Sequence, residues 1–272
     1  MLSLRQIGES ERRAMDDIVF MCNQFSDKIK SELEALRVNE GFLLSAEVTR
    51  LRGAYENALA FIEAQKVAAN LEQRFDVILC ECDWPPLLDF THRDIKAIVD
   101  EYDRTEFKQF RKDFDAALLE CYGLDALAEK ITSWQDKGLR PERLFILKKA
   151  VEAHSIGDFV LSVPVILVQI EGVIAEGMKH TGWMGGTRIR KYLETLANGY
   201  AVEPFSSSAM DFVNSTVLEQ FEWGSPLSSS LSRHAILHGA ATEYGTEVNS
   251  LKALLLFDFV VTSLYAKKLE AP

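Results

Sequence analysis

The chain has 272 residues and a formal net charge of −11. A chain of this length can bury a sizeable core as one large or two small domains, and its apolar share is that of a globular protein. The acidic balance excludes a global basic footprint of the kind that drives non-specific nucleic-acid binding. Any contact with RNA must therefore use a local basic patch, and the negative charge could also serve solubility alone.

The N-terminus carries charged residues where a signal peptide would need an apolar core. The most apolar run, residues 159–175, is interrupted by Pro164, Gln169 and Glu171, and we expect it to be too short and too polar to span a membrane. The sequence thus predicts a cytoplasmic protein with no membrane contact.

The cysteine spacing matches neither a disulfide framework nor a zinc ribbon. The four cysteines are Cys22, Cys80, Cys82 and Cys121. Cys80, Cys82 and His92 could supply three metal ligands, but free cytosolic thiols are the favoured interpretation.

Nearly every periodic segment is helical, and no convincing run of alternating strand residues occurs. Residues 18–36 form a first amphipathic pattern and residues 51–78 a second, which could be broken near Lys66. A third pattern covers residues 107–122. The segment 80–94 is predicted to be a rigid connector, because Pro85 and Pro86 cannot continue a helix.

A domain boundary is plausible in the segment 133–143, which combines Gly138, Pro141 and a charge cluster. We therefore expect an N-terminal helical domain, residues 1–138, with a regulatory or partner-binding role, and a second domain, residues 139–272. The second domain is predicted to hold helices at 142–154, 158–178, 187–197 and 246–267, with a short helix before the last one. The predicted fold class is all-α.

The segment 228–239, SSSLSRHAILHG, places Arg233 and His238 on that short helix. Pro226 and the serines at 228–230 offer a helix start, and Gly239 can end the helix. Arginine can brace a phosphate with a planar fork of donors, and histidine can move a proton near neutral pH. These groups are the minimum needed to cleave RNA without a metal.

This helix, with Arg233 followed by the polar His234 and then by His238, resembles the R-[polar]-x3-H helix of the HEPN superfamily (higher eukaryotes and prokaryotes nucleotide-binding domain). The resemblance covers the C-terminal half, from about Arg143 onward. It implies a HEPN-like helical bundle and a metal-independent endoribonuclease that cleaves RNA by 2′-hydroxyl attack and leaves a 2′,3′-cyclic phosphate. It makes Arg233 and His238 the catalytic residues and His234 a supporting one.

The family also suggests partners. Many prokaryotic members are toxins or phage-defence effectors, so an antitoxin or a sensor protein is implied beside the RNA. Members usually dimerise through the motif helix and build a composite cleft. Five residues on an ideal helix correspond to about 140° of rotation and about 7.5 Å of rise, so Arg233 and His238 do not lie on one face of the helix. Either a long arginine reach or the meeting of two motif helices in a homodimer must therefore bring them to one phosphate.

Two alternatives remain. His234 and His238 are four residues apart, a spacing that also suits a metal pair, but no glutamate lies between them as in H-E-x-x-H. We therefore predict no metal and no cofactor. The second alternative is a non-catalytic HEPN-like module that binds or dimerises around a nucleotide or a protein partner.

Glu171 is the lone acid in a strongly apolar helix, so it needs a cation or a donor. Arg233 is an attractive partner that Glu171 would orient, although a groove position that reaches water would also suffice. Gly172 beside it permits close helix approach. Asp258 is a second isolated acid that could join the same network, or lie at a dimer edge or in solvent.

The remaining candidates are substrate-binding residues. Tyr244 and Asn249 flank the turn after the motif, where such residues often cap a helix and settle a turn instead. Lys179, Arg188 and Arg190 lie around the glycine-rich segment 180–186, where Trp183 could stack a base. A solvated helix face is the alternative for these basic residues.

Overall fold

A computed structural model of the protein describes residues 43–198 and 210–270, and within these ranges the chain forms helices and connecting turns with no strand. The predicted all-α class is confirmed. The predicted first helix, residues 18–36, lies outside the described residues.

The chain divides into two compact units between Asn70 and Leu71, and one helix, α2 (Leu43–Glu81), passes through this division. The helix is continuous, so the break expected near Lys66 is wrong. The boundary predicted at residue 138 falls inside the second unit, between two helices that pack against each other. The two-domain division at that residue stays a prediction.

The first part of the second unit contains the end of α2 and three helices: α3 (His92–Arg104), α4 (Phe107–Cys121) and α5 (Leu124–Asp136). The predicted connector is shorter than expected, because Cys80 and Glu81 still belong to α2 and α3 begins at His92. Thr91 caps α3 in a reciprocal capping box with Asp94. Trp84, between α2 and α3, is fully buried. Its Nε1 donates to Asp115 Oδ1 of α4 at 2.7 Å, and its ring centroid lies 6.5 Å from that of Phe114.

The second part contains α6 (Pro141–Ser155), α7 (Phe159–Gly177), α8 (Gly186–Asn198), the π-helical turn η1 (Val213–Val217), α10 (Arg233–Leu237) and α11 (Glu247–Glu270). The bounds of α6, α7, α8 and α11 lie within a few residues of those predicted. Proline stands at the first position of α6, where its missing N–H costs nothing.

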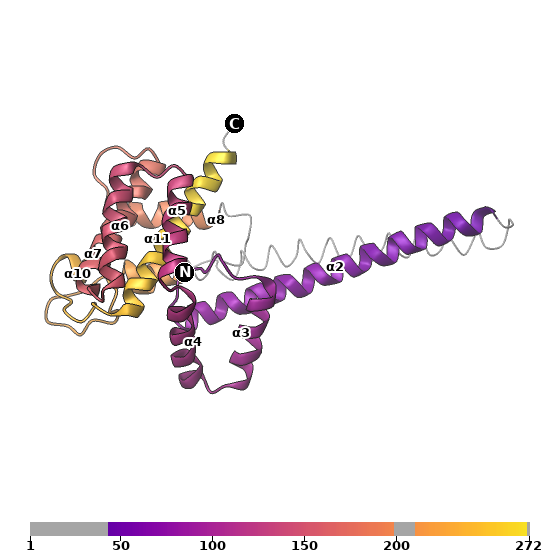
Figure 1. The fold of residues 1–272 in the computed structure, drawn as a ribbon, viewed down its shortest axis with the longest axis horizontal. Helices are drawn as coiled ribbons and strands as arrows, with labels where there is room; N and C mark the ends of the chain where they lie inside the picture. Colours follow the sequence, from indigo (N-terminus) through magenta and orange to yellow (C-terminus); the bar gives the residue numbers. More distant parts are fainter. Residues whose placement is uncertain (1–42, 199–209, 271–272) are drawn as a thin grey trace. The chain divides into compact units, whose positions relative to one another are not determined.

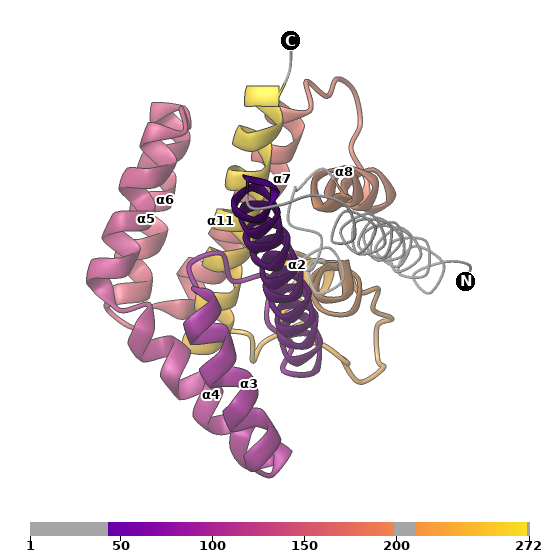
Figure 2. The ribbon, with the colours of Figure 1, turned by 90° about the vertical axis from the view of Figure 1, so that its right-hand side faces the viewer.

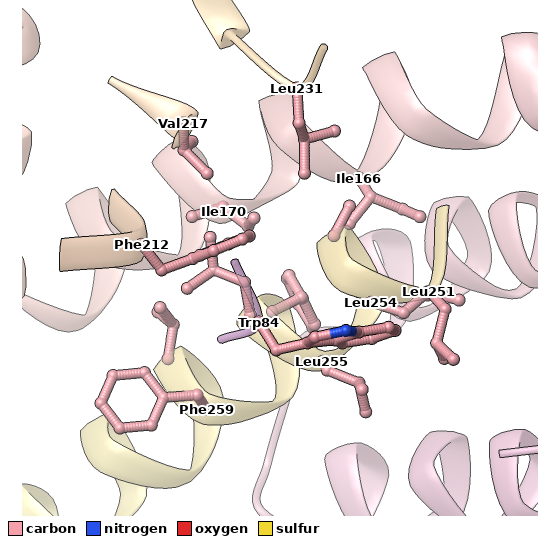
Figure 3. Close-up of a cluster of buried hydrophobic side chains, with 14 of the residues drawn as sticks. Trp84, Ile166, Ile170, Phe212, Val217, Leu231, Leu251, Leu254, Leu255 and Phe259 are labelled. Carbon is pink, nitrogen blue, oxygen red and sulfur yellow. The ribbon is translucent and has the colours of Figure 1, made fainter. Parts of the chain in front are cut away.

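The centre of this bundle is α7, which packs against α6 on one side and α11 on the other (Figures 1 and 2). Figure 3 shows a buried cluster in which Ile166 and Ile170 of α7 meet Leu251, Leu254 and Leu255 of α11. Leu231, from the loop just before α10, enters the same cluster and is fully buried. The core therefore holds in place the segment that leads into α10, the motif helix.

Two helices of the described chain are long and apolar enough to cross a membrane by length and composition, namely Phe159–Gly177 and Glu247–Ala266. The expectation that the α7 segment is too short and too polar to span a membrane is thus wrong by length and composition. The core of the bundle buries most of the α11 segment, as expected of a central helix in a globular protein. The cytoplasmic location stays a prediction.

Asp258 of α11 does not join the network around Arg233. Its carboxylate is buried and accepts hydrogen bonds from Trp134 Nε1 at 2.8 Å and from Lys130 Nζ at 2.6 Å, both on α5. A buried carboxylate needs such partners, because its desolvation is otherwise uncompensated. The expectation of a shared network, a dimer edge or a solvent-facing position for Asp258 is therefore wrong.

Candidate functional site

The motif helix α10 is a single short turn that begins at Arg233. Ser232 caps it by accepting a hydrogen bond from the Ala235 backbone N–H at 3.2 Å, and its hydroxyl donates to the Glu219 carbonyl at 3.0 Å. Pro226 and the serines at 228–230 lie in the preceding loop, so the predicted helix start there is wrong. Gly239 ends the helix with a φ of +77°, as expected of a glycine at this position.

Burial along the motif increases from Arg233 to Ile236 and is lost at Leu237 and His238. Ala235 and Ile236 are buried in the core, Arg233 and His234 are partly buried, and His238 is exposed. His238 also follows the last helical residue, Leu237. The motif thus presents one histidine to solvent from a rigidly anchored turn.

Arg233 forms an ion pair with Glu171 of α7, as the sequence predicted. One guanidinium Nη donates to the Glu171 carboxylate, and the two side chains are 18% and 24% exposed. Glu171 therefore has a cation partner, and its negative charge holds the guanidinium beside α7.

Two buried polar atoms at this site have no hydrogen-bond partner. They are Arg233 Nε and His234 Nε2, and they are the only such side-chain atoms among the described residues. A buried donor or acceptor without a partner costs about 1–3 kcal/mol, so natural proteins rarely leave one. That both belong to adjacent residues of one short helix marks α10 as a place where packing has not been optimised for stability.

His234 lies between two other groups that can carry positive charge. Its ring is parallel to that of His238, at 8° and with 6.2 Å between the ring centroids. Burial lowers the pKa of His234, and the nearby Arg233 and His238 lower it further. The imidazole is thus neutral near pH 7.

The Nε2 atom of His234 faces the start of α8. A methyl group placed at Gly186 would lie 3.4 Å from this atom. The start of α8 therefore contacts the motif helix.

A metal site built on His234 and His238 would need further ligands. In the part of the chain that the structure describes, no three side chains of the types His, Cys, Asp and Glu gather closely enough to hold a metal ion. The histidine pair thus lacks a third protein ligand there. The three cysteines within that part are free thiols.

A second ion-pair cluster lies on the opposite flank of α7. Arg143 of α6 is buried and donates to Gln169 and to Glu176 of α7, the latter at 2.6 Å from Nη2. Its guanidinium lies directly over Gly172, where an added methyl group would come within 2.6 Å of Nη1. Gly172 does permit close approach, and what approaches is the side chain of Arg143. Its partners, which are distant in the sequence, could not be read from the local pattern.

Tyr244 and Asn249 have their polar groups engaged inside the protein. The Tyr244 hydroxyl donates to the Val160 carbonyl at 3.2 Å. The Asn249 amide donates to the Tyr244 carbonyl at 3.0 Å and to Ser230 Oγ at 3.1 Å. These bonds tie the loop before α10 to the turn after it, in agreement with the turn-settling role considered for both residues.

The basic candidates lie on or near α8. Lys179 and Arg188 are exposed, whereas Arg190 is partly buried and its Nε donates to Asn214 Oδ1 at 2.6 Å. Arg188 stands in the first turn of the helix whose start contacts His234. Arg188 is an exposed cation without an ion-pair partner among the described residues, on an element that reaches the motif, whereas Arg190 is held by Asn214.

An aromatic pair that is not among the sequence-predicted residues lies next to the motif. The Phe221 ring lies 6.2 Å from that of His238 and 5.5 Å from that of Trp223, between centroids. Two aromatic residues in a short loop before the motif were the available signal. Their contact with His238 depends on how the loop folds back.

No protein-family model, curated protein or solved structure matches the chain. The HEPN resemblance therefore rests on Arg233, His234 and His238 alone and remains a prediction.

Proposed function

We propose that the chain is a metal-independent endoribonuclease of HEPN type. The observation that carries the proposal is the arrangement of α10, where an arginine held by Glu171, a neutral His234 and an exposed His238 share one turn. The two unpartnered polar atoms of Arg233 and His234 add support, because binding sites commonly keep polar groups that only a ligand satisfies.

In the proposed reaction the ribose 2′-oxygen attacks the adjacent phosphorus, and the bond from phosphorus to the 5′-oxygen of the next nucleotide breaks. One product ends in a 2′,3′-cyclic phosphate and the other begins with a 5′-hydroxyl. A base removes the 2′-hydroxyl proton, and an acid protonates the leaving 5′-oxygen. No water and no metal ion is needed for the balance.

His238 is the proposed proton-transfer residue, acting as base or acid, because its ring is exposed at the end of the turn. Arg233 stabilises the charge that builds on the phosphorane-like transition state. Glu171 orients the guanidinium and does no chemistry. His234, whose lowered pKa keeps it neutral, supports the pair without adding charge.

A second proton-transfer group could come from a second copy of the chain. The exposed side of α7 carries an apolar stripe, with Leu161 58% and Val168 44% exposed and Val165 between them at helical spacing. A copy seated on this stripe would pack against α7, the helix whose Glu171 holds the motif arginine. We propose such a homodimer as the active form.

The same stripe favours the alternative function, a non-catalytic module that dimerises or holds a nucleotide or protein partner. An exposed apolar helix face is typical of an interaction surface whether or not chemistry takes place beside it. A role as a toxin or phage-defence effector, restrained by an antitoxin or sensor protein, follows only from the family resemblance.

The test is RNA cleavage in the presence of EDTA. Wild-type protein should cut RNA, and the His238→Ala variant should not. His92→Ala is the matched control, because the exposed His92 lies 2.8 Å from Glu72 and outside α10. Cleavage that EDTA abolishes and zinc or manganese restores would favour the metal pair of His234 and His238. Absence of cleavage by folded protein on every RNA would favour the binding module.

A further inference from the structure

Two of the four tryptophans, Trp183 and Trp223, are exposed to solvent, which is rare for so large an aromatic side chain in a folded protein. Trp84 and Trp134 are fully buried, whereas Trp183 is 90% and Trp223 72% exposed. Exposing a large ring forfeits the free energy that its burial would supply. Both rings are also near the motif in the chain: Phe221 faces the ring of His238, and Gly186, at the start of α8, faces that of His234.

Trp223 is joined to the candidate catalytic residues by a row of rings. Its ring meets the edge of Phe221 at 72°, Phe221 lies next to His238, and His238 is parallel to His234. Phe221 is partly buried against the core, so it gives the exposed ring a fixed base.

Trp183 reaches the motif from the other direction. Its ring packs on Gly185, where an added methyl group would come within 2.4 Å of the indole. At the next residue, Gly186, an added methyl group would lie 3.4 Å from His234 Nε2. The Trp183 carbonyl lies 3.3 Å from His180 Nε2, which helps to hold the loop. The loop thus carries an exposed indole between the end of α7 and the start of α8.

The charges around the two rings differ. Exposed Lys179 and Arg188 flank Trp183 in the sequence, whereas Glu219 and Glu222 line a hollow of about 270 Å³ in the loop that carries Trp223. Carboxylates repel phosphate, so we expect the surface around Trp223 to bind the face of a base and not the phosphates of the RNA backbone. The backbone phosphate would lie toward Arg233.

We infer that Trp223 and Trp183 are stacking surfaces for unpaired bases next to the phosphate that is cut, so the substrate is single-stranded RNA. This inference rests on the proposed function for the place of the cut. Stacking on an aromatic ring needs an open base face, which a duplex does not offer. The net charge of −11 fits, because stacking supplies affinity that an acidic protein cannot draw from charge.

The test uses a short single strand of 2′-O-methyl RNA, which cannot be cleaved by 2′-oxygen attack. Binding is measured by fluorescence anisotropy for the wild-type protein and for Trp223→Ala, Trp223→Phe and Trp183→Ala. Each alanine variant should weaken binding by about 5- to 100-fold, and Trp223→Phe should restore most of the loss. Leu124→Ala, which changes an exposed apolar side chain of α5, should bind as the wild type does.

Two further probes separate stacking from other causes. A strand of the same length that lacks bases should bind weakly, and to the wild type and the tryptophan variants alike. A duplex should bind more weakly than the single strand. Equal single-strand affinity of the wild type and the alanine variants, or equal affinity for the strand without bases, would overturn the inference, as would absence of binding to any strand. Such a result would favour a protein contact for the two tryptophans.

The outcome is independent of catalysis. If the 2′-O-methyl strand binds through the tryptophans but ordinary RNA is not cut, the proposed nuclease fails and the stacking site stands. If RNA is cut but the tryptophan variants bind normally, the stacking site fails and the nuclease stands.

Discussion

The carboxylate of Glu171, in the second half of α7, accepts a hydrogen bond from the guanidinium of Arg233, the first residue of α10. This pair connects the central helix of the bundle to the only helix that carries the proposed chemistry. The two groups are mostly buried, so the loss of either one leaves a charge in a poorly solvated position.

The first prediction concerns the coupling of this pair. Glu171→Gln and Arg233→Ala should each lower the free energy of unfolding, by an amount between the ~1 kcal/mol of an exposed pair and the ~3–5 kcal/mol of a fully buried one. The double variant should lose less than the sum of the two. Urea unfolding of all four proteins measures this, and strictly additive losses would show that the residues are not coupled.

A second prediction concerns Gly172. An alanine in the middle of a helix is normally more stable than a glycine by about 1 kcal/mol. Here Gly172→Ala should instead destabilise by about 1–3 kcal/mol, because the methyl group would collide with the Arg143 guanidinium. In an Arg143→Ala background the same change should become neutral or stabilising. If alanine has the same effect in both backgrounds, the close approach of Arg143 is not what requires glycine.

The third prediction is a pH dependence of stability that arises from His154. This buried side chain of α6 hydrogen-bonds Ser250 at 2.8 Å through Nδ1, and burial lowers its pKa against an opposing influence of Glu247. The unfolded chain then binds the proton more readily than the folded one. The free energy of unfolding should therefore fall as pH is lowered through about 6.5 and level off below the folded pKa.

The measurement is urea unfolding between about pH 8 and pH 5, the range in which histidine changes charge. His154→Gln keeps a hydrogen-bonding side chain near Ser250 but does not titrate, so its stability should change less with pH. The pKa of His234 is lowered as well and should leave a residual slope of the same sign. An unchanged slope in the His154→Gln protein would exclude His154 as the cause.

A fourth prediction addresses the homodimer. A charge placed on the apolar stripe of α7, as in Val168→Glu, should convert the dimer to a monomer at micromolar concentration and abolish RNA cleavage. Ile156→Glu is the matched control, because Ile156 is also exposed but lies beyond the end of α6. Light scattering separates the two states. A wild-type monomer with full nuclease activity would contradict a composite site.

Much of the fold could be predicted because the long helices carry strong patterns. The segments that became α7 and α11 are apolar nearly all round, which suits only a central position in a bundle. Two amphipathic helices, α3 and α5, were missed. For α3 a signal was available, since Thr91 and Asp94 form a capping box just before the buried Ile95 and Val99.

The candidate site was less predictable, because its geometry depends on residues distant in the sequence. Several serines offered a start for the motif helix, and only the fold shows that Ser229 is bonded to the Thr216 carbonyl, Ser230 to Asn249, and Ser232 serves as the cap. The isolated acids behaved differently from each other for the same reason. Glu171 forms the expected ion pair with Arg233. Asp258 instead accepts hydrogen bonds from Lys130 and Trp134, which no local sequence pattern links to it.

The most direct test of the proposed chemistry is the identity of the new RNA ends. Wild-type protein in EDTA should produce a 2′,3′-cyclic phosphate and a 5′-hydroxyl, as read by mass spectrometry of a short substrate, and a single 2′-deoxy nucleotide on the 5′ side of the cut should block it. A product with a 3′-hydroxyl and a 5′-phosphate, or cleavage that survives the 2′-deoxy substitution, would contradict attack by the 2′-oxygen and with it the role assigned to Arg233 and His238.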